Sequence, residues 1–279
     1  MYISGPVRVD IWQGNDGKIL TIFGDEHYSQ KGKCFKGRTV IDILNKQIDM
    51  GGVVYIENLP LEYRKIYGIN RFDNSSWLSN ISNWAIERES LYPSQIVFVD
   101  IRYPPAVPMA VVENALENAE IKLEKNLVND QVSNTVFMEC FGDVGILLRD
   151  NYEYLKTKNL RKKCVFPFLE NLSHDLKTQL LQKQTKFFDL ISKNKTIHKN
   201  SFYFLCEEVY KAYSYYQDIY TLQKIQEHNA KQHFLCVGWG HLDTLQDFLV
   251  NSGFHLVTTL HPHNKKRKRC IKVPVKYVS

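Results

Sequence analysis

Two short glycine-led turns, Gly24-Asp25-Glu26-His27 and Gly238-Trp239-Gly240-His241, each place a histidine just after a run of apolar residues. Glycine lets the backbone turn sharply and leaves room for a ligand. Imidazole is the side chain that titrates nearest to neutral pH, and it is also a common metal ligand. We therefore predict that the two turns flank one functional site.

Charged side chains follow two further apolar runs. Glu57 comes directly after residues 53–56, and Asp100 and Arg102 follow residues 95–99. If these runs are parallel strands, their carboxyl ends meet along one edge of a sheet, where ligands bind in such folds. The residues predicted for this edge are Asp25, Glu26, His27, Glu57, Asp100, Arg102 and His241.

Two kinds of chemistry fit this set of residues. One divalent cation (Mn, Co or Zn) could be held by His27, His241, Glu57 and Asp25. Without a metal, a histidine or glutamate could act as general base toward water while Arg102 stabilises an oxyanion. The sequence does not choose between them. Taken singly, a glutamate after a strand is more often a helix cap or a surface charge, and a lone histidine is more often structural.

The elements that must position these residues predict an α/β fold. Residues 7–13 alternate apolar and polar side chains, residues 14–17 have turn composition, and residues 18–23 form an apolar run, which together predict an N-terminal β-hairpin. Residues 39–50 have helical apolar spacing and precede the apolar residues 53–56, which predicts a parallel βαβ unit. We expect a mostly parallel central sheet flanked by helices.

The rest of the chain is expected to complete a single domain over residues 1–279. Residues 110–230 are predicted to be mainly helical, a middle insertion whose clearest helices span 110–127 and 202–230. A strand over 233–237, a helix over 242–251 and a strand over 254–260 follow the second turn. Residues 270–275 are predicted to be an edge strand, where Pro274 is tolerated.

Composition favours a soluble, intracellular protein. The chain has 279 residues, of which 44% are hydrophobic and 24% charged, as in ordinary globular domains. It has no apolar run of the roughly 18 residues that span a membrane and no signal-peptide pattern. The six cysteines form no CxxC motif, so we predict small buried thiols in a reducing cytosol.

One segment, Lys265-Lys266-Arg267-Lys268-Arg269, carries most of the net charge of +6. Of the 36 basic residues five lie in this run, and the other 31 nearly balance the 30 acidic residues. Such a run binds nucleic acid, directs nuclear import, or is simply a solvated loop. Nucleic acid is therefore a weaker candidate partner, and the nucleus a second candidate location.

At these residues the chain resembles the superfamily that includes the TIKI and TraB proteins, the ChaN-like proteins and the erythromycin esterases. Members have a strand entering a Gly-x-x-His turn, with Asp25 here in the place of a frequent Glu, and a strand ending in Glu, here Glu57. They close with a strand, a Gly-x-Gly-His turn, a helix and a Gly-led strand, matched by residues 234–257. An Arg next to Asn or Asp in the preceding helix is matched by Gln217-Asp218, where Gln replaces the Arg.

The resemblance implies a hydrolase-type site in which Asp218 supports the histidines. Within this superfamily the activities differ, since TIKI proteins are similar to metal-dependent proteases, erythromycin esterases open a lactone and ChaN-like proteins bind haem. The expectation is a hydrolase that acts on an ester or amide bond of a small molecule or peptide. The chain is also similar to uncharacterised proteins of large DNA viruses, which would place it in the host cytoplasm.

Two other readings stay open. The chain could be a binding or scaffolding protein that keeps the fold without chemistry, because the Arg is missing beside Asp218. It could also be a calcineurin-like metallophosphoesterase, since Gly-Asp-x-His is typical of that class. A two-metal site needs further Asp, Asn and His motifs, and no Gly-Asp-x-x-Asp or Gly-Asn-His is present.

Overall fold

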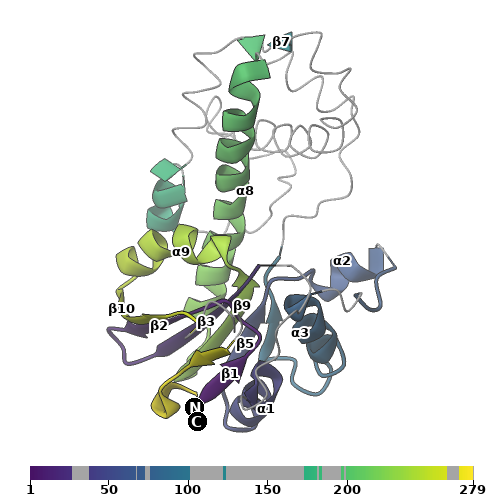
Figure 1. The fold of residues 1–279 in the computed structure, drawn as a ribbon, viewed down its shortest axis with the longest axis vertical. Coiled ribbons are helices and arrows are strands. Elements are labelled where there is room, and N and C mark those ends of the chain that lie inside the picture. Colours follow the sequence, from purple (N-terminus) through teal and green to yellow (C-terminus); the bar gives the residue numbers. More distant parts are fainter. Residues whose placement is uncertain are drawn as a thin grey trace. The chain divides into compact units, whose positions relative to one another are not determined.

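The computed structural model describes residues 1–26, 38–66, 68–72, 76–100, 122–123, 173–180, 182–183, 196–197, 199–262 and 270–278. The chain divides into two compact units. One unit is Met1–Ile101 with Tyr220–Ser279, and the other is Arg102–Ile219. The first unit holds a six-stranded sheet that lies between helices (Figure 1).

The main sheet is mixed but mostly parallel, in the order β10-β2-β3-β9-β5-β6. Its strands are β2 (Arg8–Gly14), β3 (Ile19–Asp25), β5 (Val53–Ile56), β6 (Ile96–Phe98), β9 (Gln232–Gly238) and β10 (Phe254–Leu260). From β3 to β6 all neighbouring strands are parallel, whereas β2 is antiparallel to both of its neighbours, β3 and β10. This confirms the predicted α/β class with a mostly parallel central sheet.

The predicted N-terminal hairpin is present as β2 and β3. Gly17 has φ of +83° in the connecting turn, a conformation that glycine adopts without strain. The amide of Gly14 donates to the carbonyl of Lys18 at 2.8 Å and closes the turn. The hairpin therefore delivers β3 into the first glycine-led turn.

Helix α1 (Val40–Asp49) has a capping box at its start and a glycine with positive φ just after its end. The hydroxyl of Thr39 accepts from the Asp42 amide at 3.2 Å, and the Asp42 carboxylate accepts from the Thr39 amide at 2.9 Å. Gly51, with φ of +85°, ends the helix before β5. The crossover through α1 does not bring β5 next to β3. Strand β9, which comes much later in the chain, lies between them and pairs with both.

Helices cover both faces of the main sheet. Helices α1 and α3 (Trp77–Ile86) share a core with one face, to which Phe23, Val54 and Phe234 contribute. The other face meets α9 (Gly240–Asn251) and the final turns of α8 (Lys199–Glu227), where the Tyr55 hydroxyl on β5 lies 3.4 Å from the Lys224 carbonyl. Helix α2 (Leu61–Ile66) lies between β5 and α3 in the chain.

A second, three-stranded sheet joins the two ends of the chain. Its order is β11-β1-β4, with β1 (Tyr2–Ser4) in the centre, β4 (Arg38–Thr39) and β11 (Cys270–Lys272). The predicted edge strand over 270–275 ends at Lys272, because Pro274 begins a 3₁₀ turn, η2 (Val275–Tyr277). It lies at an edge, but of this smaller sheet.

The middle of the chain departs from the sequence prediction at one point. Strand β7 (Lys122–Leu123) pairs in parallel with β8 (Thr196–Ile197), where a helix over 110–127 was expected. The pairing joins residues far apart in sequence, which local periodicity cannot show. The remainder of that predicted helix lies outside the described residues, whereas the helix predicted over 202–230 is α8.

Within the described part of the chain, no helix is both long and apolar enough to cross a membrane. Two of the six cysteines have a described environment, and one of these two is the buried thiol that was predicted. Cys236 is a free, buried thiol, whereas Cys270 is disulfide-bonded.

Candidate functional site

The two glycine-led turns begin side by side at the carboxyl edge of the main sheet. Asp25, the last residue of β3, is in register with Gly238, the last residue of β9. The amide of Trp239 donates to the Asp25 carbonyl at 2.8 Å. On the other side of β9, the amide of Glu57 donates to the Cys236 carbonyl at 2.9 Å. Three strand ends are therefore tied together by backbone hydrogen bonds.

Glu57 is the group that organises this edge. One of its carboxylate oxygens accepts from the backbone amide of Gly238. The other, Oε1, lies 3.2 Å from Nε2 of His241, at the start of α9. Both side chains are buried. The His241 contact has the length of an ion pair without the angles of a directional hydrogen bond. Glu57 thus holds the second turn through the Gly238 amide and also lies beside the histidine of that turn.

The Asp25 side chain contacts a different element, helix α3. Its carboxylate accepts from the amide of Leu78 at 3.3 Å, in the first turn of α3. Amides in the first turn of a helix lack intrahelical acceptors, so a carboxylate there stabilises the helix start. Burial, together with the negative charge of Asp25, raises the pKa of the neighbouring Cys236 thiol. The geometry thus places Asp25 at this edge as a support for α3.

Gly24 allows the two turns to approach. A methyl group on its Cα would lie 2.8 Å from Cδ1 of Leu242 and 3.3 Å from Cα of Trp239. These distances are shorter than ordinary van der Waals contact. The space that the sequence suggested for a ligand is, at Gly24, occupied by the first turn of α9.

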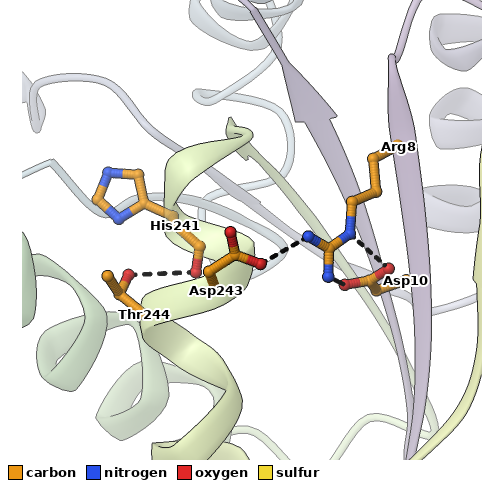
Figure 2. Close-up of polar contacts among 5 residues, drawn as sticks. All are labelled: Arg8, Asp10, His241, Asp243 and Thr244. Carbon is orange, nitrogen blue, oxygen red and sulfur yellow. Dashed lines mark hydrogen bonds and ion pairs between the residues drawn. The ribbon is translucent and has the colours of Figure 1, made fainter.

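The start of α9 is also held by an ion-pair network that sequence reasoning missed (Figure 2). Arg8 donates twice to the buried carboxylate of Asp10, at 3.0 and 2.7 Å, and once to Asp243 at 2.7 Å. The network joins β2 to α9. Figure 2 shows the His241 imidazole pointing away from this network, so the two features are separate. Arg8 and Asp243 are 235 positions apart, and no local pattern connects them.

The other predicted site residues fall in three groups. Glu26 is exposed beside Asp25, and Asp100 is buried, with its amide donating to the Asn58 carbonyl at 3.1 Å. His27 and Arg102 lie outside the described residues, as does the basic run 265–269. Asp218 is buried on α8, in the second unit. The described edge therefore brings Asp25, Glu57, Asp100 and His241 to the ends of adjacent strands.

Three of the four predicted metal ligands, Asp25, Glu57 and His241, belong to the described residues. Among the described residues, no group of three or more His, Cys, Asp and Glu side chains is arranged to hold a metal ion. Glu57 and His241 have a compatible geometry as a pair, because two donor atoms 3.2 Å apart can share a tetrahedral cation. His27, the fourth predicted ligand, cannot be placed with them.

A second buried histidine, His233, lies at the opposite end of β9. Its Nε2 is 2.8 Å from the Ala230 carbonyl and its Nδ1 is 3.1 Å from the Tyr55 hydroxyl. The carbonyl requires a proton on Nε2, so the neutral ring accepts the Tyr55 proton at Nδ1. Burial lowers the pKa of His233 to about 4. The hydroxyl also lies 3.2 Å from Nδ1 of His228. The sequence contains no spacing that would have revealed this cluster.

Comparisons with protein-family models, with curated proteins and with solved structures found no match to this chain.

Proposed function

We propose that this chain is a hydrolase of ester or amide bonds whose general base is His241, oriented by Glu57. The observation that carries the proposal is the buried Glu57 carboxylate 3.2 Å from the His241 imidazole. Glu57 is itself anchored by the Gly238 amide, at the ends of parallel strands. Supporting evidence is the location, since this edge is where α/β sheets bind ligands.

Glu57 and His241 have different roles in the proposed proton transfer. The Glu57 carboxylate beside Nε2 orients the imidazole of His241, which acts as the base. When His241 takes a proton from water, the positive imidazolium is stabilised by the adjacent Glu57 charge. The hydroxide formed would then attack the substrate carbonyl. When the tetrahedral intermediate collapses and the C–O or C–N bond breaks, the imidazolium of His241 would return its proton to the leaving alcohol or amine. In this proposal Arg102, which lies outside the described residues, would stabilise the oxyanion.

A divalent cation is the alternative within the same proposal. Glu57 and His241 would supply two of its ligands, and the cation would polarise the substrate carbonyl or acidify water. The remaining ligands would come from His27 or from water. Dialysis against a chelator, followed by activity measurement with and without added Zn²⁺ or Mn²⁺, distinguishes the two arrangements.

The test is a set of matched variants assayed on a panel of aryl and alkyl esters and amides. His241→Ala and Glu57→Gln are expected to lower kcat/KM by a factor on the order of 10² to 10⁴, the usual contribution of a general base. His255→Ala is the control, because His255 is an exposed histidine on β10, paired in register with Gln13 and away from Glu57 and His241. Full activity of folded His241→Ala would contradict the proposal.

The two other functions predict different results in the same assays. Turnover of bis(4-nitrophenyl) phosphate with two bound metals per chain would identify a metallophosphoesterase. Salt-dependent binding of duplex DNA that is lost when residues 265–269 are neutralised, without turnover of any ester, would identify a binding protein.

A further inference from the structure

Trp239 is set apart from the other three tryptophans of the chain. Trp12, Trp77 and Trp84 are buried to 95% or more, whereas the side chain of Trp239 is 50% exposed. An indole is the largest apolar side chain, and leaving half of it in water forgoes a substantial part of its burial energy. A single exposed apolar residue is common on protein surfaces, so position must decide whether this one has a role.

The backbone of Trp239 is held firmly although its side chain is exposed. Its amide donates to the Asp25 carbonyl at 2.8 Å, and its carbonyl accepts from the Leu242 amide at 3.1 Å. Its Cα packs against Gly24, where even a methyl group would be too close. The indole thus extends from a backbone position in the second glycine-led turn that is held against the first turn.

The neighbours of Trp239 are the proposed catalytic pair. Gly238, on one side, gives its amide to Glu57. His241 follows two residues later, with Nε2 3.2 Å from the same carboxylate. Gly238 and Gly240 carry no side chains that would cover the indole. The backbone of Trp239 therefore lies beside the residues that would perform the chemistry, and its indole is half exposed.

We infer that Trp239 binds the substrate of this site through an uncharged aromatic group stacked on its indole. Aromatic pairs are favoured over aliphatic contacts of equal area by their offset or edge-to-face geometry. The carboxylates of Asp25 and Glu57 and the exposed Glu26 disfavour an anionic group at this edge. The inference rests on the proposed function, because the aromatic group belongs to the substrate of the Glu57–His241 pair.

Binding is tested without catalysis, using 2-phenylethanol and its saturated analogue 2-cyclohexylethanol. The indole N–H signal of Trp239 in a ¹H–¹⁵N spectrum is identified by its loss in Trp239→Leu or, should that variant misfold, in Trp239→Phe. The aromatic alcohol should shift this signal at a concentration several-fold lower than the saturated one. No shift, or equal response to the two alcohols, would overturn the inference.

Turnover is tested with methyl phenylacetate and methyl cyclohexylacetate, which share a leaving group and differ only in the ring. Trp239→Leu should raise KM for the aromatic ester about fivefold, in line with the extra energy of an aromatic pair. The effect should be smaller in Trp239→Phe and for the saturated ester. Leu91→Ala, at another exposed apolar side chain, should change neither value. An equal rise in KM for both esters would contradict aromatic selectivity.

The two experiments separate the two proposals. If 2-phenylethanol shifts the Trp239 signal but no ester is hydrolysed, the hydrolase proposal fails and the aromatic site stands. If esters are hydrolysed by a His241-dependent reaction that Trp239→Leu leaves unchanged for both substrates, the aromatic site is refuted and the hydrolase stands.

Discussion

At the scale of single residues, the buried histidines show how position decides chemistry. His241 faces a carboxylate, which stabilises its charged form. His233 faces the hydroxyl of Tyr55 and a backbone carbonyl, and burial disfavours its charged form. Of these two histidines, we therefore propose only the first as a general base. The second is held neutral, as part of the packing between β5, β9 and the end of α8.

The neutral state of His233 predicts acid-sensitive stability. Its pKa is about 4 in the folded protein and 6.5 as an unperturbed imidazole. Between these values the unfolded chain binds more protons, so the free energy of unfolding falls as pH falls from about 6.5 to about 4. The loss should be about 3 kcal/mol. Urea unfolding followed by tryptophan fluorescence at several pH values measures it.

The matched variant is His233→Gln, which retains an acceptor for the Tyr55 hydroxyl and does not titrate. It should be less stable than the wild type at pH 7 but lose much less stability between pH 6.5 and pH 4. An unchanged slope in this pH window would assign the acid sensitivity to other groups.

At the scale of elements, the site depends on how closely α9 approaches β3. Helix α9 has no side-chain cap at Trp239. Its start is held instead by the Trp239 amide on Asp25, by Asp243 on Arg8 and by the contact of Leu242 with Gly24. A small displacement of this turn would change the separation between His241 and Glu57.

Gly24→Ala tests this dependence. The new methyl group would meet Cδ1 of Leu242 at 2.8 Å, so we expect a loss of about 1 to 3 kcal/mol in the free energy of unfolding. Activity should fall by more than the unfolded fraction explains, because His241 moves with α9. Thermal unfolding and kcat measured on the same sample separate the two effects.

The companion variant is Leu242→Val, which shortens the side chain that the methyl group would meet. Gly24→Ala should cost less stability in this background than in the wild type, giving a coupling energy between the two positions. Additive losses would mean that Leu242 yields without strain and that Gly24 is not required for the approach of α9.

At the scale of the whole molecule, the two ends of the chain pack together in the core of the first unit. Ile3 on β1 is in register with Ile271 on β11, and both side chains are fully buried. They belong to the core that includes α1 and α3. Contacts between residues so far apart in sequence become favourable only once most of the fold has formed.

Truncating Ile271 to Ala should therefore destabilise the whole first unit. The expected loss is about 2 to 5 kcal/mol in the free energy of unfolding, the usual cost of removing a buried branched side chain. Val275→Ala is the control, because Val275 is exposed and should change stability by less than about 0.5 kcal/mol. Urea unfolding measures both, and equal stability of the two variants would show that β11 can detach without loss.

Local sequence signals predicted the elements whose ends are marked by turn or capping residues. The β2–β3 hairpin has alternating residues around Gly17, and α1 has apolar spacing between Thr39 and Gly51. Helix α3 could have been predicted in the same way. Ser76 caps it, and apolar side chains recur with helical spacing at Trp77, Leu78, Ile81, Trp84 and Ala85.

The sequence by itself also determined that polar residues end the parallel strands, because each follows an apolar run. Only the tertiary structure decided which of them meet. Glu57 faces His241 because β9 lies between β3 and β5, an order set by long-range pairing. Asp25 supports α3 because its side chain lies on the sheet face that α3 covers. Side-chain partners depend on strand order and sheet face, and neither is encoded in local spacing.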